Sequence, residues 1–371
     1  MNKFLITFLR LLVLFWVASS FAATDSSQQI LLKLKGFISN IESQKVDLQG
    51  GAVAILYKGQ VIYKTTFGHQ KGNTGPITEH TLFPLASSSK PVSAIAIALM
   101  VDQGLLSFDE KFTLPYIKAP INLVHIMSHT TGYQLRGDTE IERGFSRQKL
   151  FNVLKKMQPK SKPGNSYFYS NAIFSMVEEA LNKKKLSLEK SIDNLCTALG
   201  TSEIKLSVDA DQELAYPHSK KTVDGVDKIA ALSLPPYYPK IVPAAAGIFA
   251  SINGMIEIYK LCFGYRPDLI SEATLKRTFT KVRSNHEIFK WRLKLPVDEK
   301  NIESTYALGW RVLKVKDRPG KDLIFHSGAI NGIRSFIGYM PSAEIGIIIL
   351  TNQDTKFPID TGMALWGEFF D

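Results

Sequence analysis

Cysteine is nearly absent from this chain, which carries only Cys196 and Cys262 among its 371 residues. So few thiols exclude a small fold that depends on a network of disulfides. Both cysteines lie in apolar stretches, which predicts buried thiols, and the sequence leaves open whether the two form a disulfide. Internal repeats and low-complexity tracts are also missing, and an apolar content of 45% with 21% charged residues is typical of a globular protein.

Long apolar runs are missing after the amino terminus, which excludes a later segment that crosses a bilayer. The first residues combine a positive region at Lys3 and Arg10 with an apolar run over 11–18 and small residues before Ala22. This pattern predicts that residues 1–22 are a cleaved export signal and that the protein is periplasmic or secreted. No cysteine follows the run, so a lipoprotein anchor is excluded, while an uncleaved anchor remains the alternative.

Acidic residues are outnumbered, with 34 against 45 lysines and arginines, and the net charge is +11. The basic residues are scattered, apart from short clusters at 183–185 and 220–221, and no nucleic-acid-binding motif accompanies them. We therefore predict no nucleic-acid partner and a solvated cationic surface that suits anionic polymers of the cell envelope.

The order of patterns along the chain predicts an α+β fold. Helical spacing over 27–45 precedes two strands within 50–67, and the chain is then mostly helical from Ser87 to about residue 240. Short segments rich in β-branched and aromatic residues follow, before a final helix from 359; we expect these strands at 306–313, 323–326, 335–340 and 345–351.

Early and late strands must pair in one central antiparallel sheet with flanking helices, because strands at both ends of the chain enclose a helical stretch. We expect a single domain over residues 23–371. Its sheet lobe would comprise 27–80 and 245–371, and a mostly helical lobe, 81–244, would be inserted between them.

Ser87 and Lys90 stand three residues apart at the start of a helix that is apolar on nearly every face. An amine buried there is desolvated and lies near the positive end of the helix dipole, and both effects lower its pKa. Lys90 can then accept the proton of the Ser87 hydroxyl. The pair therefore predicts an activated serine nucleophile.

The same spacing of serine and lysine recurs three times in charged or mixed surroundings, where the lysine should be solvated. For these copies we expect helix caps or loops with surface lysines; their serines are Ser146, Ser187 and Ser202.

Two further motifs fall where such a hydrolase needs them. In Tyr169-Ser170-Asn171 the phenol can pass a proton and the amide can hold a substrate carbonyl, although a helix cap beside a core tyrosine would have the same sequence. His326-Ser327-Gly328 ends an expected strand, and its glycine lets a substrate backbone approach closely. An ordinary turn is the alternative there.

With these three motifs in order, the chain resembles the serine β-lactamase and penicillin-binding protein superfamily, in particular its class C-like branch. That branch includes β-lactamases, D-alanyl-D-alanine carboxypeptidases, D-aminopeptidases and esterases. The resemblance runs from about residue 48 to 352 and includes landmarks outside the motifs, at 81–83, 103–109, 123–132, 246–251, 308–310 and 350–352. It implies a β-lactamase/transpeptidase-like fold and hydrolysis of amide or ester acyl groups without a metal or organic cofactor.

The resemblance also implies residue roles. Ser87 would attack the carbonyl, and Lys90, alone or with Tyr169, would take its proton. The backbone N–H groups of Ser87 and Ala329 would form the oxyanion hole. Asn171 would orient the substrate amide, and His326 would hold a substrate carboxylate or tune Tyr169.

One departure bears on the substrate. Class C β-lactamases usually carry Lys-Thr-Gly at the third motif, whereas histidine at position 326 looks like the carboxypeptidase, aminopeptidase and esterase members. We expect a monomer that acts on a small-molecule or peptide acyl compound, with peptidoglycan-derived peptides among the candidates.

Two alternatives stand beside this interpretation. A penicillin-binding or wall-binding protein that is acylated without turnover would carry the same motifs. His125 and His129 are spaced like zinc ligands on a helix, but neither a glutamate base nor a third ligand accompanies them, so we expect no metal.

Overall fold

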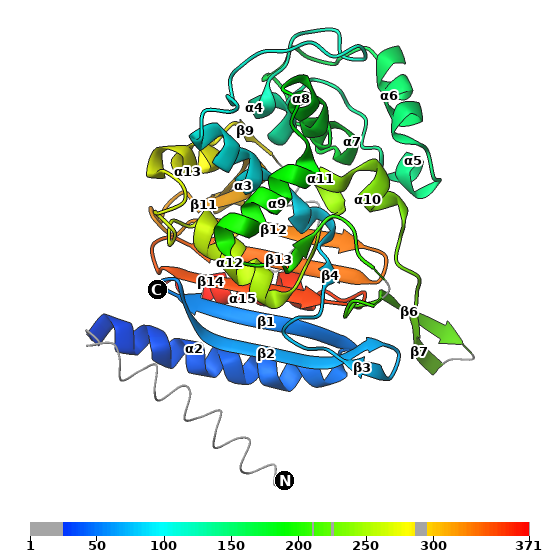
Figure 1. Cartoon of the computed structure of the whole chain (residues 1–371). Coiled ribbons are helices and arrows are strands. Elements are labelled where there is room, and N and C mark those ends of the chain that lie inside the picture. Colours follow the sequence, from blue (N-terminus) through cyan, green and yellow to red (C-terminus); the bar gives the residue numbers. More distant parts are fainter. Residues whose placement is uncertain (1–24, 210, 224–225, 286–294, 371) are drawn as a thin grey trace.

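A large antiparallel sheet forms the centre of the molecule (Figure 1), as the computed structural model shows for residues 25–209, 211–223, 226–285 and 295–370. Within these residues, nine strands pair in the order β3-β2-β1-β14-β13-β12-β11-β10-β9. Their bounds are β1 (Gly50–Tyr57), β2 (Gln60–Lys71), β3 (Thr74–Pro76), β9 (Arg283–Ser284), β10 (Ile302–Tyr306), β11 (Arg311–Val315), β12 (Leu323–Ile330), β13 (Ile333–Met340) and β14 (Ile345–Thr351).

An early strand and a late strand of the chain are neighbours inside this sheet. β1 pairs antiparallel with β14, with Ala52 opposite Leu350. Alternate residues of β1 enter different cores, because successive side chains of a strand point to opposite faces: Ala54 packs into one core and Val53 into the other. The α+β fold and the pairing of early with late strands are thus confirmed.

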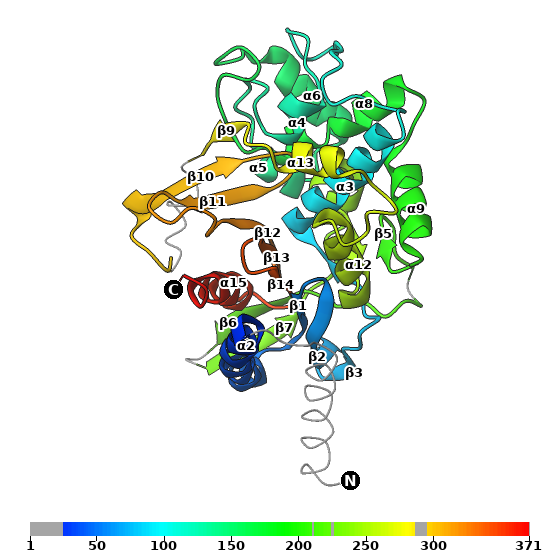
Figure 2. The same ribbon diagram turned by 90° about the vertical axis from the view of Figure 1, so that its left-hand side faces the viewer.

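Helices cover both faces of the sheet. Figure 2 shows α2 (Asp25–Gln44) and α15 (Phe357–Gly367) against one face, opposite α3 (Ser89–Asp102) and α12 (Ile252–Cys262). The other α-helices of the described residues are α4 (Leu123–Met127), α5 (Asp138–Glu142), α6 (Arg147–Lys156), α7 (Asn171–Phe174), α8 (Val177–Lys183), α9 (Leu188–Leu199), α10 (Tyr237–Ile241), α11 (Pro243–Ala246) and α13 (Glu272–Phe279). Among the described residues, no helix is both long and apolar enough to span a bilayer.

The helix expected behind the nucleophile is α3. It is buried from Ser89 to Met100, as its apolar composition on every face requires. The chain leaves the helix at Gln103 and turns at Gly104, whose φ of 72° lies in the left-handed region that glycine adopts without strain.

Two segments differ from the expected elements. The strand expected over 306–313 is a hairpin, because β10 ends at Tyr306 and β11 begins at Arg311. Gly309 makes the turn with a φ of 80°, and its N–H donates to the carbonyl of Met127. Within the stretch expected to be mostly helical, β6 (His218–Val223) and β7 (Val226–Ala231) form a two-stranded sheet.

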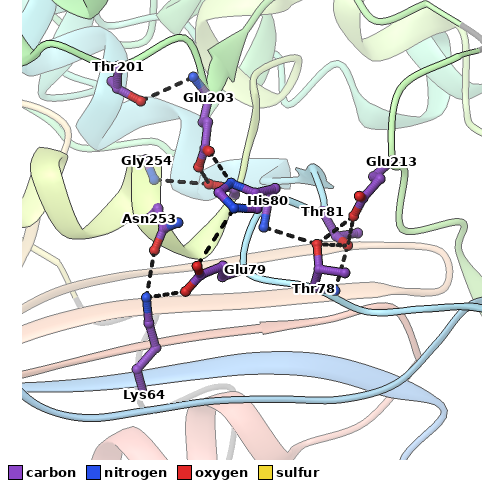
Figure 3. Close-up of polar contacts among 11 residues, drawn as sticks. Lys64, Thr78, Glu79, His80, Thr81, Thr201, Glu203, Glu213, Asn253 and Gly254 are labelled. Atoms are coloured by element: carbon purple, nitrogen blue, oxygen red, sulfur yellow. Dashed lines mark hydrogen bonds and ion pairs between the residues drawn. The ribbon is translucent and has the colours of Figure 1, made fainter.

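A small sheet supports the segment that leads to Ser87. It consists of β4 (Phe83–Pro84), β8 (Phe249–Ala250) and β5 (Ile204–Lys205). Polar contacts hold the residues just before β4 (Figure 3): His80 Nδ1 lies 2.5 Å from Glu203 Oε1, and Lys64 of β2 contacts both Glu79 and Asn253. The segment that leads to Ser87 is therefore linked to β2, to the residue before β5 and to α12.

The predicted export signal, residues 1–22, lies outside the described residues, and the division into sheet and helical lobes stays a prediction. Cys196 and Cys262 are free and buried.

Candidate active site

Ser87 lies on a 3₁₀ turn, Ala86–Ser88, between β4 and α3. Ala86, which precedes it, has a φ of 49°, a left-handed conformation that costs an alanine about 1–2 kcal/mol. The hydroxyl of Ser335 holds this turn by donating to the Leu85 carbonyl at 2.7 Å and by lying 2.8 Å from the Ser88 hydroxyl. Packing against β13 therefore maintains the strained turn. Ser87, at the centre of this turn, lines a cleft of about 380 Å³.

Lys90 is completely buried behind Ser87, and its Nζ lies 3.4 Å from Ser87 Oγ. Burial holds the pKa of the Lys90 amine well below its ordinary value; the charge of Asp138 opposes this shift, and the charges of Arg311 and Arg136 add to it. The neutral amine has two hydrogens and one lone pair, so Lys90 is suited to accept a proton from Ser87.

Tyr169 contacts the same hydroxyl. Its Oη lies 2.9 Å from Ser87 Oγ, and its ring lies 4.7 Å from Lys90 Nζ. The next residue, Ser170, caps α7 by accepting a hydrogen bond from the N–H of Ile173 at 3.0 Å. The motif 169–171 therefore provides a helix cap through Ser170 and also brings the phenol of Tyr169 to Ser87.

Asn171 connects Lys90 to a charged pair. Its Oδ1 accepts from Lys90 Nζ at 2.6 Å, and its Nδ2 donates to Asp138 Oδ1 at 2.7 Å. Arg136 in turn forms an ion pair with Asp138. Because the carboxylate can only accept, it fixes which end of the Asn171 amide faces Lys90.

His326 is buried on β12, and its two ring nitrogens have partners: Tyr306 Oη lies 2.9 Å from Nε2, and the Ser327 carbonyl lies 3.0 Å from Nδ1. A carbonyl only accepts, so Nδ1 carries the proton and Nε2 accepts from Tyr306. Burial, with the charges of Arg311 and Lys90, holds the pKa of His326 well below its ordinary value. The ring is neutral and lies outside the lining of the cleft, 6.4 Å from the Tyr169 ring.

Gly328 lies where β12 packs against Ala86–Ser88, which we call the nucleophile turn. A Cβ at this position would lie 2.2 Å from the Leu85 carbonyl oxygen, 2.3 Å from Ser335 Oγ and 3.0 Å from the Ser87 nitrogen. Only glycine permits this approach, which brings the strand backbone beside the Ser87 N–H. The next residue, Ala329, lines the cleft.

The structure thus gathers all seven predicted site residues around one cleft. Lys90 and His326 lie behind its wall, and the other five line it: Ser87, Tyr169, Asn171, Gly328 and Ala329. Charged side chains of both signs complete the lining, among them Arg136, Asp138, Glu142, Arg334, Lys356 and Asp360.

Sequence reasoning missed several residues of this site. Asp138 had no motif around it. His129 packs 4.5 Å from the Tyr169 ring with a φ of 60°, and Tyr306 and Arg311 flank the turn that contains Trp310. The sequence had pointed to His129 only as one of two histidines with zinc-ligand spacing, and the landmarks at 123–132 and 308–310 indicated no role for these residues.

The remaining serine–lysine pairs lie away from the cleft. Ser146 caps α6, and Ser187 caps α9, each by accepting from the backbone N–H three residues later. Lys205 lies in β5. Of the two histidines weighed as zinc ligands, His125 accepts through Nδ1 from the N–H of Asn122 in a capping box.

Comparison with known proteins gives concordant matches. The beta-lactamase family model matches residues 38–365. A beta-lactamase of Escherichia coli is 24% identical over 370 residues, covering 92% of each protein. The esterase EstB of Burkholderia gladioli is 34% identical over 94 residues, which is 22% of this chain and 24% of that protein. A solved class C beta-lactamase has a TM-score of 0.68 and 21% identity over 94% of this chain and 99% of its own, and this likeness shows the shared fold.

Proposed function

The chain belongs to the beta-lactamase family, and on this premise we propose that it is an exported acyl hydrolase whose nucleophile is Ser87. One observation carries the proposal: Ser87 Oγ faces both a buried amine, Lys90 Nζ at 3.4 Å, and a phenol, Tyr169 Oη at 2.9 Å, at the wall of an open cleft. A nucleophile beside its base is the arrangement that covalent acyl transfer needs.

Acylation begins when the Ser87 proton moves to Lys90, directly or through Tyr169. The serine oxygen then forms a bond to the substrate carbonyl carbon, and the carbonyl electron pair moves to its oxygen. The N–H groups of Ser87 and Ala329 are proposed to stabilise this oxyanion, since the close packing of Gly328 on the nucleophile turn brings β12 beside Ser87.

The leaving group departs with the proton that Ser87 released. Tyr169 contacts Ser87 and lines the cleft beside it, so its phenol is suited to deliver that proton to an amine or alkoxide. Water then gives a proton to the same base and attacks the acyl carbonyl carbon. The bond from that carbon to the Ser87 oxygen breaks, the base returns the proton to Ser87, and the acid is released.

Two substrate-binding roles are refined by the contacts. Asn171 already gives Oδ1 to Lys90 and Nδ2 to Asp138, which supports a role in orienting the base. Of the two roles expected for His326, tuning of Tyr169 is supported, because the histidine is buried beside Tyr169 and does not line the cleft.

The decisive experiment is covalent labelling. We expect a fluorophosphonate probe to label the purified protein on Ser87, and Ser87→Ala to lose the label and all hydrolysis of short-chain esters, a chromogenic cephalosporin and D-Ala-D-Ala peptides. Ser202→Ala, which removes a look-alike serine, is the control and should retain both. Labelling that survives in Ser87→Ala contradicts the proposal. Labelling of Ser87 without turnover on any of the three substrate classes contradicts hydrolysis and identifies a binding protein.

Export and the monomeric state are proposed from the sequence. We expect mature protein from the native host to be recovered outside the cytoplasm, with Ala23 at its amino terminus, and to elute as a monomer. Recovery in the cytoplasm with residues 1–22 intact would contradict export.

A further inference from the structure

Arg311 is the first residue of β11 and is almost completely buried, with 1% of its surface exposed. It lies opposite Tyr306 on β10 and opposite Phe325 on β12. A guanidinium stays charged at every pH at which proteins fold, and burying its charge is costly. A side chain whose burial is this costly, placed beside the active site, is a candidate for a role in the reaction.

The buried charge lies over the ring of Tyr169. Arg311 Cζ is 5.2 Å from the centroid of the Tyr169 ring and 5.5 Å from that of Tyr306. Lys90 Nζ lies 4.7 Å from the Tyr169 centroid, so two basic side chains contact one phenol. A cation over an aromatic face is attracted by its electrons, and the attraction grows when the phenol becomes an electron-rich phenolate.

The other titratable groups packed around Tyr169 are held towards their neutral forms. Burial lowers the pKa values of Lys90 on α3, His129 after α4 and His326 on β12, and the charge of Arg311 adds to each shift. Asp138 and Arg136 act on Lys90 with opposite signs from the far side of Asn171. The third motif contributes no charge here, because its first residue is the neutral His326. Arg311 is a nearby residue that supplies a permanent positive charge.

We propose that Arg311 is a positioning residue of acylation: its guanidinium stabilises the phenolate form of Tyr169 and so enables Tyr169 to accept the Ser87 proton. In that step the Ser87 O–H bond breaks and its proton goes to the Tyr169 oxygen, while the serine oxygen bonds to the carbonyl carbon and the carbonyl π electrons move to the carbonyl oxygen. This inference rests on the proposed function, since it assigns a role within the same reaction.

The test compares Arg311→Met, which removes the charge, with Arg311→Lys, which keeps one, and with Arg318→Met as a control for the loss of an exposed arginine. The ionisation of Tyr169 is followed by tyrosinate absorbance, as the difference between each protein and the same protein carrying Tyr169→Phe. In parallel, the burst of Ser87 acylation by a p-nitrophenyl ester is measured across the pH range.

We expect Arg311→Met to move the Tyr169 ionisation and the rising limb of acylation to higher pH by about one unit, with Arg311→Lys returning both towards wild type and Arg318→Met leaving both unchanged. A Tyr169 signal that stays in place overturns the inference, even if the kinetic limb moves through Lys90. A uniform loss of rate at every pH also overturns it, because that indicates a structural role.

Two controls separate the possible failures. If Arg311→Met does not fold, the wild-type protein decides: Tyr169 must ionise at lower pH than the other tyrosines, and ionisation with or after them overturns the inference. Wild-type protein that shows no Ser87-dependent burst contradicts the proposed function, whereas a normal burst with an unmoved Tyr169 signal in Arg311→Met overturns only the role of Arg311.

Discussion

The amide of Asn171 holds the amine of Lys90, with Oδ1 2.6 Å from Nζ. The Ala245 carbonyl accepts from the same amine at 2.9 Å, so a neutral Lys90 uses both of its hydrogens and keeps its lone pair for Ser87. Asp138 fixes the Asn171 amide from its other end. The direction in which Lys90 can take a proton is therefore set by residues on α5, α7 and α11.

Asp138 also acts on Lys90 through its charge, which raises the pKa of the amine against the effect of burial. Replacing it in Asp138→Asn removes that opposition and lowers the pKa further. Because the neutral amine is the active form, we expect the rising limb of acylation to move to lower pH by about one unit, measured as the ester burst rate against pH. A limb that moves to higher pH would contradict the assignment of Lys90 as base.

The close packing of β12 on the nucleophile turn gives a second prediction. In Gly328→Ala the new methyl group would overlap the Leu85 carbonyl and Ser335 Oγ, so β12 must move away from Ser87. We expect acylation to fall by about 10²-fold or more, the loss typical of a damaged oxyanion hole, together with a lower melting temperature. Gly36→Ala is the control, since nothing lies within 4 Å of its Cβ and alanine favours a helix. Equal acylation in both variants would refute the proposed role of this strand.

The ion pair between His80 and Glu203 gives a prediction about stability and pH (Figure 3). The hydrogen bond and charge of Glu203 raise the pKa of His80. A raised pKa in the folded state means that the pair stabilises the protein at acid pH and that this contribution disappears as pH rises through the raised value. We expect His80→Asn to lower the melting temperature slightly at acid pH and to match wild type at alkaline pH. The opposite order would show that the contact does not hold the segment before β4.

The parts of the molecule that the sequence predicted are those with local signals. The helix after Ser87 is apolar on every face, and the expected strands 335–340 and 345–351 lie in β13 and β14. The hairpin at 306–313 was missed because Gly309 interrupts a run whose composition is that of a strand throughout. The β6–β7 sheet was missed because β6 is mostly polar, with Lys220 among its residues, and because the apolar residues of β7 do not alternate with polar ones.

The residues of the candidate active site also divide into those with a local sequence signal and those without one. Ser87 and Lys90 are three residues apart and carry a local signal, whereas Asp138, His129 and Arg311 reach the site only through the fold. Arg311 in particular follows Trp310 in a stretch that suggests nothing but a strand. The sequence predicted burial, the main cause that lowers the pKa of Lys90, but not the charges of Asp138 and Arg311, which act on the same amine from distant parts of the chain.

His326 gives a last prediction, again about protonation. Burial holds its pKa well below the ordinary 6.5, so the folded protein keeps the ring neutral where the unfolded chain takes up a proton. As pH falls below about 6.5, the wild-type protein should therefore lose stability, at up to about 1.4 kcal/mol per pH unit for this histidine. His326→Gln has no titrating group, and we expect its free energy of unfolding, measured in urea at several pH values, to be lower near neutral pH but to fall less steeply in acid. An identical acid slope in both proteins would mean that His326 is protonated in the folded state, and the tautomer that lets Nε2 accept from Tyr306 would then be wrong.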